Sequence, residues 1–235
     1  MKFKLFYILV IGIISCTFGQ HKSDLEKIDS LKKYVYNSKG QDSTSLATAN
    51  YNIAEYYRKT TPFADSAFFY YHKAEKIFKQ LNTKYELALT LYGIAVIQKN
   101  EKDFIGSEVT SIEALTLLEY LNENDNVINL KSFIYNNLGI VFRELEQYQE
   151  SLNYFNKCIE LKRKLKGDNR LNIDTSINNL ANTLKKANQF ELAKKYYSQI
   201  LANKNLIRER PDIYALVLDN YANTLYLSKQ YDELP

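Results

Sequence analysis

Apolar residues recur at intervals of three and four along most of the chain. One stretch places Leu152, Phe155 and Ile159 at this spacing, and a later one places Leu192 and Tyr196 in the same way. This is the period of a helix with one apolar face, and it differs from the alternation expected of a strand. The pattern therefore predicts an all-α chain.

Short polar stretches, such as Glu146-Gln147 and Asn188-Gln189, separate the periodic segments and predict tight turns. A further amphipathic segment at residues 24–37 precedes the others, and we expect it to cap the end of the array. The remaining helices are expected at residues 44–59, 64–79, 84–99, 103–121, 126–145, 148–166, 171–186, 189–205 and 211–228.

Four sequence markers recur in one register and group the helices into pairs. The middle of each first helix has a small residue, at Ala54, Ala95, Gly139, Ala181 and Ala222, with intervals of 41, 44, 42 and 41. An aromatic residue follows nine positions later, at Phe63, Phe104, Tyr148, Phe190 and Tyr231. The second helices place small residues at Ala67, Ser107, Ser151 and Ala193, and compact ones seven positions further on at Ala74, Ala114, Cys158 and Ile200. Small residues let two helices approach closely, and the aromatic ring fills the gap beside the turn.

These markers resemble the tetratricopeptide repeat family over about residues 44–235. The resemblance implies a superhelical α-α solenoid of four full repeats and a truncated fifth, which binds proteins or peptides and is not an enzyme. The repeats are longer than the usual length of about 34 residues. In this they look like the extended repeats of kinesin light chains, and they lack the proline that often ends a repeat.

The first twenty residues have the order of an export signal. Lys2 and Lys4 precede the apolar run LFYILVIGII, and small and polar residues follow. We favour a signal peptide at residues 1–19, followed by a capping helix and linker at residues 20–43. Alternatively, the sequence Ile13-Ile14-Ser15-Cys16 resembles a bacterial lipoprotein box, which would make Cys16 a lipidation site. Either route predicts a protein of the periplasm or cell envelope.

The order of signal peptide and repeats resembles the N-terminal, envelope-facing half of bacterial sensor kinases and regulators that contain tetratricopeptide repeats. The chain stops at Pro235, where the second helix of the fifth pair would begin. We therefore expect a piece of a longer signalling protein. Two alternatives remain open, a free-standing envelope adaptor and a repeat region attached to an unseen enzyme domain.

Composition narrows the function classes. The chain has 20 Tyr and 12 Phe but only 7 Gly and 3 Pro, as expected of packed helices with few turns. The net charge of +4 on 235 residues gives no reason to expect nucleic acid. We expect no metal or cofactor, because the sequence lacks metal-ligand spacings and phosphate-binding motifs. The two cysteines predict no disulfide framework, and Cys158 is expected in the core.

The family resemblance implies a peptide-binding groove lined by the first helices. Residues at i, i+4 and i+7 share a helix face. They give the candidates Tyr51, Glu55 and Arg58; Tyr92, Val96 and Lys99; Asn136, Ile140 and Arg143; Asn178, Asn182 and Lys185; Asp219, Asn223 and Tyr226.

The last position of the groove set is basic in four successive repeats, at Arg58, Lys99, Arg143 and Lys185. Such a column predicts an acidic partner segment, whereas the alternative is a solvated helix face. Asparagine side chains nearby could hydrogen-bond an extended peptide. Family members that clamp a C-terminal carboxylate have lysine at the first position of this set. Here that position holds Tyr, Asn or Asp, so we do not expect this clamp.

Overall fold

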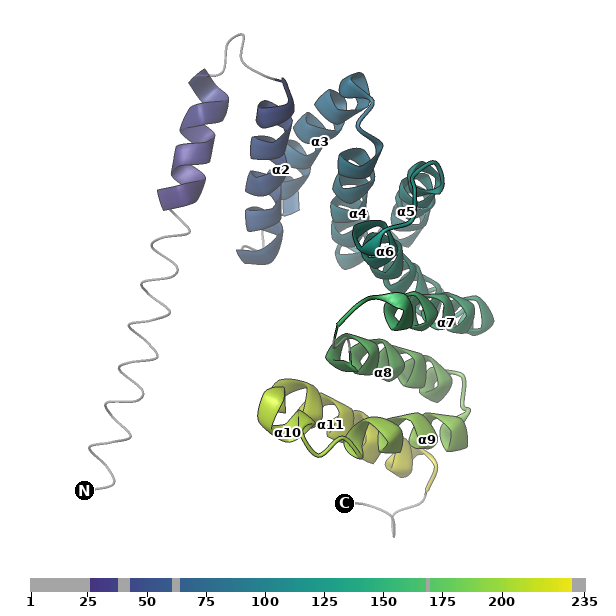
Figure 1. Ribbon diagram of the computed structural model, residues 1–235. Helices are drawn as coiled ribbons and strands as arrows, with labels where there is room; N and C mark the ends of the chain where they lie inside the picture. Colours follow the sequence, from purple (N-terminus) through teal and green to yellow (C-terminus); the bar gives the residue numbers. More distant parts are fainter. Residues whose placement is uncertain (1–25, 38–42, 61–63, 168–169, 230–235) are drawn as a thin grey trace, which may run out of the picture. The chain divides into compact units, whose positions relative to one another are not determined.

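The structure is a computed structural model that describes residues 26–37, 43–60, 64–167 and 170–229. Within these ranges all regular structure is helical, and no strand is present. Residues 26–37 form a helix and are followed by the labelled helices of Figure 1. These are α2 (Ser43–Thr60), α3 (Ala64–Leu81), α4 (Lys84–Asn100), α5 (Phe104–Glu119), α6 (Asp125–Glu144), α7 (Tyr148–Lys164), α8 (Arg170–Lys186), α9 (Phe190–Leu201), α10 (Leu206–Glu209) and α11 (Pro211–Leu227).

Eight of the nine expected repeat helices agree with the structure to within two residues at each end. The helix expected at residues 189–205 is wrong, because α9 ends at Leu201 and a separate short helix follows. At this break the backbone N–H of Asn203 donates to the carbonyl of Ile200, and that of Leu206 donates to the carbonyl of Asn203. The turn buries Leu206 completely, against a core cluster that includes Ile200 and Val217. Burial of this leucine accounts for the break.

The chain divides into two compact units, Met1–Thr83 (unit 1) and Lys84–Pro235 (unit 2). In unit 1, α2 packs against α3. In unit 2, α4 pairs with α5, α6 with α7 and α8 with α9, and α11 packs on α9 (Figure 1). The first helices α4, α6, α8 and α11 also contact one another in that order. The prediction of an all-α solenoid of paired helices is confirmed.

The small residues of the repeat register lie where the two helices of a pair meet. Ala95 and Gly139 of the first helices are buried, as are Ser107 and Ser151 of their partners. The hydroxyl of Ser107 donates to the carbonyl of Ala95 at 2.7 Å, and that of Ser151 donates to the carbonyl of Gly139 at the same distance. A serine at this place fills the contact and satisfies its own buried hydroxyl.

The same backbone turn joins the two helices of each pair in unit 2. Lys102, Glu146 and Asn188 have φ values of 65°, 61° and 59°, in the left-handed region. After Glu146, the backbone N–H of Gln147 donates to the carbonyl of Phe142 at 2.9 Å. This bond and its equivalents satisfy carbonyls in the last turn of the first helix, as in a Schellman motif. The repeat register therefore extends to the backbone of the turns.

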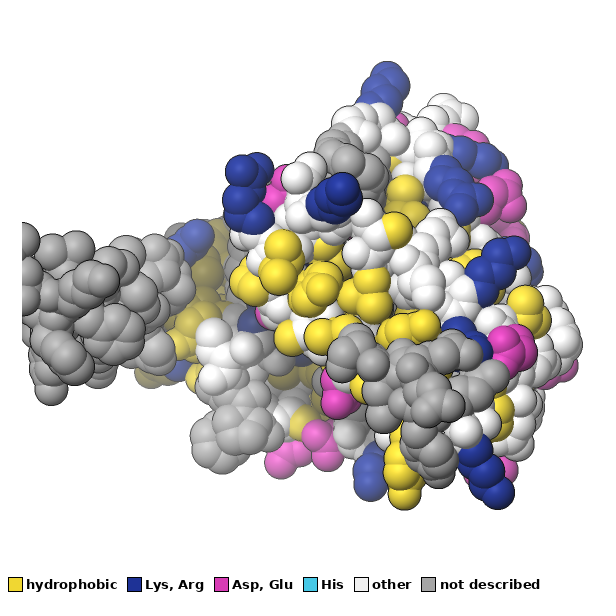
Figure 2. Space-filling model, turned by 90° about the horizontal axis from the view of Figure 1, so that it is seen from below, with side chains coloured by type: hydrophobic (Ala, Val, Ile, Leu, Met, Phe, Trp, Pro, Cys, Tyr) yellow, Lys and Arg dark blue, Asp and Glu magenta, His cyan; other side chains and the backbone are white. Residues whose placement is uncertain are grey.

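Unit 2 exposes hydrophobic side chains at the end formed by α10 and α11. Figure 2 shows them gathered in the middle of the face seen from below, with Lys and Arg side chains around them. The large exposed apolar residues of these two helices are Ile207, Leu216, Tyr226 and Leu227.

Candidate functional site

The candidate groove residues of unit 2 lie on four first helices that pack in succession. We call this set the first-helix face: Tyr92, Val96 and Lys99 on α4; Asn136, Ile140 and Arg143 on α6; Asn178, Asn182 and Lys185 on α8; Asp219, Asn223 and Tyr226 on α11. Val96 and Asn178 are buried, Asp219, Asn223 and Tyr226 are exposed, and the others are half-buried. Tyr92 stacks on Phe133, with 6.1 Å between the ring centroids.

Asparagine side chains connect successive first helices. The Asn179 amide Nδ2 donates to Oδ1 of Asn136 at 3.1 Å, which ties α8 to α6. One repeat later, the Asn220 Nδ2 donates to Oδ1 of Asn178 at 3.3 Å, which ties α11 to α8. The two bonds span 43 and 42 residues and join equivalent positions. Asn136 and Asn178 therefore stabilise the solenoid, and one acceptor of each is already used.

One position of the second helices holds either tyrosine or phenylalanine, and the choice matches the polarity of the residue at the middle position of the first helix. The hydroxyl of Tyr197 donates to Oδ1 of Asn182 at 2.8 Å. In the preceding repeat the position of Asn182 is taken by Ile140, and the position of Tyr197 by the fully buried Phe155. Tyrosine thus occurs where a polar partner is available and phenylalanine where it is not. Burial raises the pKa of Tyr197, so this residue remains a neutral donor.

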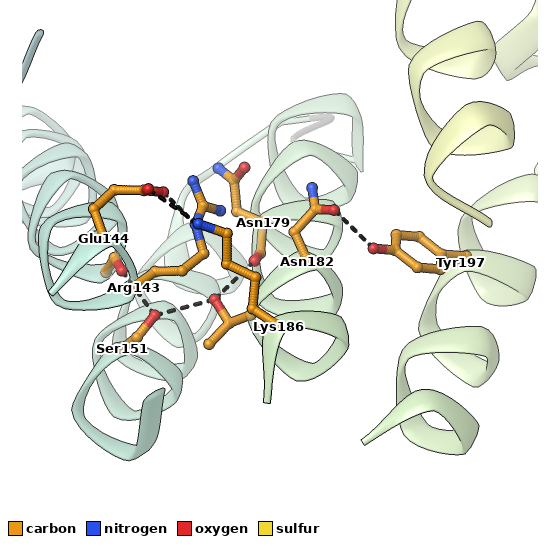
Figure 3. Close-up of polar contacts among 9 residues, drawn as sticks. Arg143, Glu144, Ser151, Asn179, Asn182, Lys186 and Tyr197 are labelled. Atoms are coloured by element: carbon orange, nitrogen blue, oxygen red, sulfur yellow. Dashed lines mark hydrogen bonds and ion pairs between the residues drawn. The ribbon is translucent and has the colours of Figure 1, made fainter. Parts of the chain in front are cut away.

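Positive charge gathers where the last turns of α6 and α8 meet. Nε of Arg143 and Nζ of Lys186 each lie 3.0 Å from a different carboxylate oxygen of Glu144, and the three side chains converge in Figure 3. Burial alone would raise the pKa of Glu144, but hydrogen bonds from Lys186 and Arg143 lower it, so the carboxylate stays ionised. One carboxylate is therefore shared by two cations.

A third cation, Lys185, is next to this group. Its Nζ donates to Oδ1 of Asn220 at 3.1 Å. Partial burial lowers the pKa of Lys185, the positive charges of Arg143 and Lys186 lower it further, and Asp219 acts in the opposite direction. Three cations and two carboxylates leave this group, which we call the α6–α8 basic cluster, with a net positive charge. Such a cluster can bind a carboxylate or phosphate oxygen.

A structural role also explains why basic residues recur at the last position of the groove set. Lys99, Arg143 and Lys185 all lie in the last turn of their helices, as does Arg58 of α2. Cations at a helix C-terminus interact favourably with the helix dipole. This effect acts within each helix and does not require Arg143 and Lys185 to approach one another. The helix dipole therefore explains the recurrence but not the clustering.

In unit 1 the equivalent candidates form an internal network. Arg58 donates through Nε and Nη2 to the two carboxylate oxygens of Glu55, at 2.9 and 2.8 Å. The hydroxyl of Tyr71 on α3 also donates to Glu55, and Tyr51 packs against the Tyr71 ring. Burial alone would raise the pKa of Glu55, but hydrogen bonds from Arg58, Lys59 and Tyr71 lower it to about 2. The side chains of Arg58 and Glu55 are only 19% and 16% exposed, so the network occupies both residues without a ligand.

Sequence reasoning missed the partners that tie the groove residues together. Each of these partners directly follows a member of the i, i+4, i+7 set in the sequence: Glu144, Asn179, Lys186 and Asn220. One signal was present in the sequence, namely the recurring pairs Asn136-Asn137, Asn178-Asn179 and Asp219-Asn220. The sharing of Glu144 between two helices had no such signal, because it depends on how the helices pack.

Of the two cysteines, the structure describes only Cys158. Cys158 is fully buried next to Ser176, with 3.4 Å between Sγ and Oγ, and burial raises the pKa of its thiol. Cys16 and the whole segment 1–19 lie outside the described residues. Within the described part of the chain, His, Cys, Asp and Glu form no group of three or more that could hold a metal ion. Of the helices searched there, none combines the length and apolar character needed to cross a membrane.

A comparison with protein families matches residues 131–205, from α6 to the end of the α9–α10 turn, with the model described as tetratricopeptide repeat. The match shows that this segment is similar to tetratricopeptide repeats. It includes Asn136, Arg143, Asn178, Asn182 and Lys185. No curated protein matches the chain.

Solved structures extend the likeness in fold to most of the chain. A crystal structure of BtubC (BKLC) from P. vanneervenii has a TM-score of 0.70 at 16% identity and covers 90% of this chain and 84% of that one. A Podosopora anserina protein, described as a kinesin light chain with nearly identical TPR-like repeats, has a TM-score of 0.57 at 14% identity. Here 83% of this chain and 92% of that chain are covered. At these identities the likeness shows a shared fold.

Proposed function

We propose that this chain is a non-catalytic scaffold that binds an acidic segment of a partner protein along the first-helix face of unit 2. The tetratricopeptide match supports a protein-interaction role. The observation that carries the acidic preference is the α6–α8 basic cluster. There, Arg143 and Lys185 come from successive repeats and their like charges oppose one another. A carboxylate from a partner would relieve this repulsion.

The shape of the partner follows from the spacing of polar groups on the face. Asn182 and Asn223 occupy the middle position on α8 and α11, and Arg143 and Lys185 are near the helix ends. Amide groups can pair with the donors and acceptors of an extended backbone, and the cations can pair with its acidic side chains. The expected ligand is therefore an extended segment with several Asp or Glu residues.

The test removes the two opposed charges. Arg143→Gln/Lys185→Gln is compared with Arg163→Gln/Lys195→Gln, which removes one Arg and one Lys from exposed positions on the second helices α7 and α9. The probe is a fluorescein-labelled peptide with Glu at alternate positions, followed by fluorescence anisotropy. Exposed ionic contacts contribute about 0.2–1 kcal/mol each, so the groove variant should bind about two- to thirtyfold more weakly.

The salt dependence and the control decide the outcome. Binding to the parent chain should weaken as salt rises, and the groove variant should show a smaller dependence. The control variant should bind like the parent. Equal binding of the groove variant and the parent at low salt, or no binding of acidic peptides to the parent, would reject an acidic groove.

We further propose that the chain is exported and serves as the interaction part of an envelope signalling protein. The support is the tripartite pattern of residues 1–19 and the resemblance in arrangement to envelope-facing sensor regions. Expression in a bacterial host followed by fractionation and mass spectrometry tests export. A mature chain that begins at Gln20 supports simple cleavage, and one that begins with a lipid-modified Cys16 supports the lipoprotein route. Recovery of the uncleaved chain in the cytoplasm would contradict both.

A further inference from the structure

Unit 1 contains an open hollow, away from the groove candidates of α2. It has a volume of about 600 Å³ and lies between the helix at residues 26–37 and α3. The residues that line it are Lys32, Lys33, Val35, Tyr36, Tyr70 and Lys73. All six are basic, aromatic or aliphatic. The hollow therefore combines positive charge with apolar surface.

Aromatic rings hold two of the three lysines in place. Nζ of Lys73 lies 4.2 Å from the centroid of the Phe69 ring and 5.9 Å from that of Tyr70. Nζ of Lys32 lies 5.2 Å from the centroid of the Tyr57 ring. A cation–π contact orients an ammonium group and leaves its charge uncompensated. These lysines are thus positioned without losing their ability to attract an anion.

Few carboxylates compete for these charges. Asp29 lies 3.8 Å from Lys32, and the Asp29 side chain is 74% exposed, so this ion pair is weak. Among the described residues, Lys33 and Lys73 form no ion pair with a carboxylate. Both lysines are exposed. The rim of the hollow therefore keeps an excess of positive charge.

The wall of the hollow exposes aromatic surface. Tyr36 is 86% exposed, the highest value among the large apolar residues described. Tyr70 is fixed by stacking on Tyr57, with 5.9 Å between centroids and 11° between ring planes. A stacked ring beside an exposed one suits a ligand that carries an apolar or aromatic group next to its negative charge.

We propose that this hollow is a second binding site, which takes an acidic protein segment with an aromatic or aliphatic residue next to a carboxylate. The mixed lining favours a protein segment, because Tyr36 and Tyr70 can pack on a single apolar side chain while the lysines pair with the carboxylate next to it. The site differs from the first-helix face in its unit, its residues and its use of aromatic rings. It therefore goes beyond the proposed function of unit 2.

The experiment compares two pairs of lysines. Lys33→Gln/Lys73→Gln removes two rim charges, and Lys76→Gln/Lys79→Gln removes two exposed charges of α3 outside the hollow. Both pairs change the net charge equally, and circular dichroism checks that both fold. The probe is a fluorescein-labelled peptide of alternating Glu and Tyr. The rim variant should raise its Kd about three- to tenfold, and the control variant less than about twofold.

Because the same peptide can reach the groove of unit 2, each pair is also measured in the Arg143→Gln/Lys185→Gln background. If Lys33→Gln/Lys73→Gln still weakens peptide binding in this background, the loss arises at the hollow. This holds whether or not the groove of unit 2 binds acidic peptides. Tyr36→Ser should weaken binding of the Glu–Tyr peptide and leave a Glu–Ser peptide unaffected.

Three results would overturn the proposal. One is that the rim variant binds the peptide as tightly as the parent. Another is that the control variant loses as much affinity for the peptide as the rim variant does. The third is binding of vesicles of anionic phospholipid that depends on Lys33 and Lys73 while the peptide does not bind, because the surface would then recognise a membrane.

Discussion

At the scale of single residues, Gly139 lies at a close contact between α6 and α7. A Cβ atom built at this position would lie 2.7 Å from the ring of Phe155, closer than carbon atoms can approach. The equivalent positions hold Ala95 and Ala181, and the residue four positions after Ser107, which corresponds to Phe155, is the smaller Ser111. The repeat with Ala181 has the large ring of Tyr197 at the corresponding place, so a large ring does not by itself require glycine. At Gly139 it is the close approach of Phe155 that leaves no room for a Cβ atom.

We expect Gly139→Ala to destabilise unit 2 by about 1–3 kcal/mol, and Gly139→Leu by at least as much, because the ring of Phe155 must move. Thermal unfolding followed by circular dichroism measures the change. In the Phe155→Leu background the cost of Gly139→Ala should fall, since the two residues are in contact. Unchanged unfolding of both glycine variants would show that the repeat register is misassigned.

A second prediction at this scale concerns pH. The folded-state pKa of Glu55 is about 2, below the ordinary value of 4.5. A depressed carboxylate pKa gives stability that is fully present above pH 4.5 and is lost as the pH falls toward 2. Each unit of pKa depression corresponds to about 1.4 kcal/mol. Stability at α2 and α3 should therefore fall over this window.

Hydrogen exchange of α2 and α3 measured at several pH values tests the prediction. Glu55→Gln should be less stable than the parent at neutral pH, because Arg58 loses its ion-pair partner, and the difference should shrink as the pH approaches 2. A difference that is constant with pH would mean that Glu55 is not the titrating group.

At the scale of elements, the second helices differ in how they begin. The side chain of Asp103 accepts a hydrogen bond from the backbone N–H of Gly106 at 2.9 Å and caps α5. Gln147 has the same place before α7 and makes no side-chain cap bond. Gln147→Asp should stabilise the protein by about 0.5–1 kcal/mol, and Asp103→Ala should destabilise it by about 1 kcal/mol. Urea unfolding of the two variants measures the change in the free energy of unfolding. If Gln147→Asp destabilised the protein, the prediction that a side-chain cap is missing at α7 would be contradicted.

Helix positions were predictable from the sequence because the apolar period and the small-residue markers are strong local signals. The break after Leu201 was not, because it depends on burying Leu206 in a core formed by other helices. Among the groove candidates, the sequence identified Asn136 and Asn178 but not their partners Asn179 and Asn220. Which side chains meet across helices depends on packing geometry, and the helical period alone does not define it.

At the scale of the whole molecule, the asparagine bonds and the α6–α8 basic cluster belong to the same set of first helices. The bonds tie α6, α8 and α11 together, and on the same helices Arg143 and Lys186 share Glu144 while Lys185 donates to Asn220. Internal hydrogen bonding and the proposed ligand binding thus use neighbouring positions on one surface. In unit 1 the same positions form the Glu55–Arg58–Tyr71 network, so unit 2 is where we expect the groove to bind.

Chemical-shift mapping with an acidic peptide tests this central claim most directly. The isotope-labelled protein is titrated with a peptide that has Glu at alternate positions. Amide signals of α6, α8 and α11 around Arg143, Lys185 and Asn223 should shift, those of α7 and α9 should change little, and Arg143→Gln/Lys185→Gln should remove the shifts. Shifts concentrated on the second helices, or unaltered by the two substitutions, would contradict binding at the first-helix face.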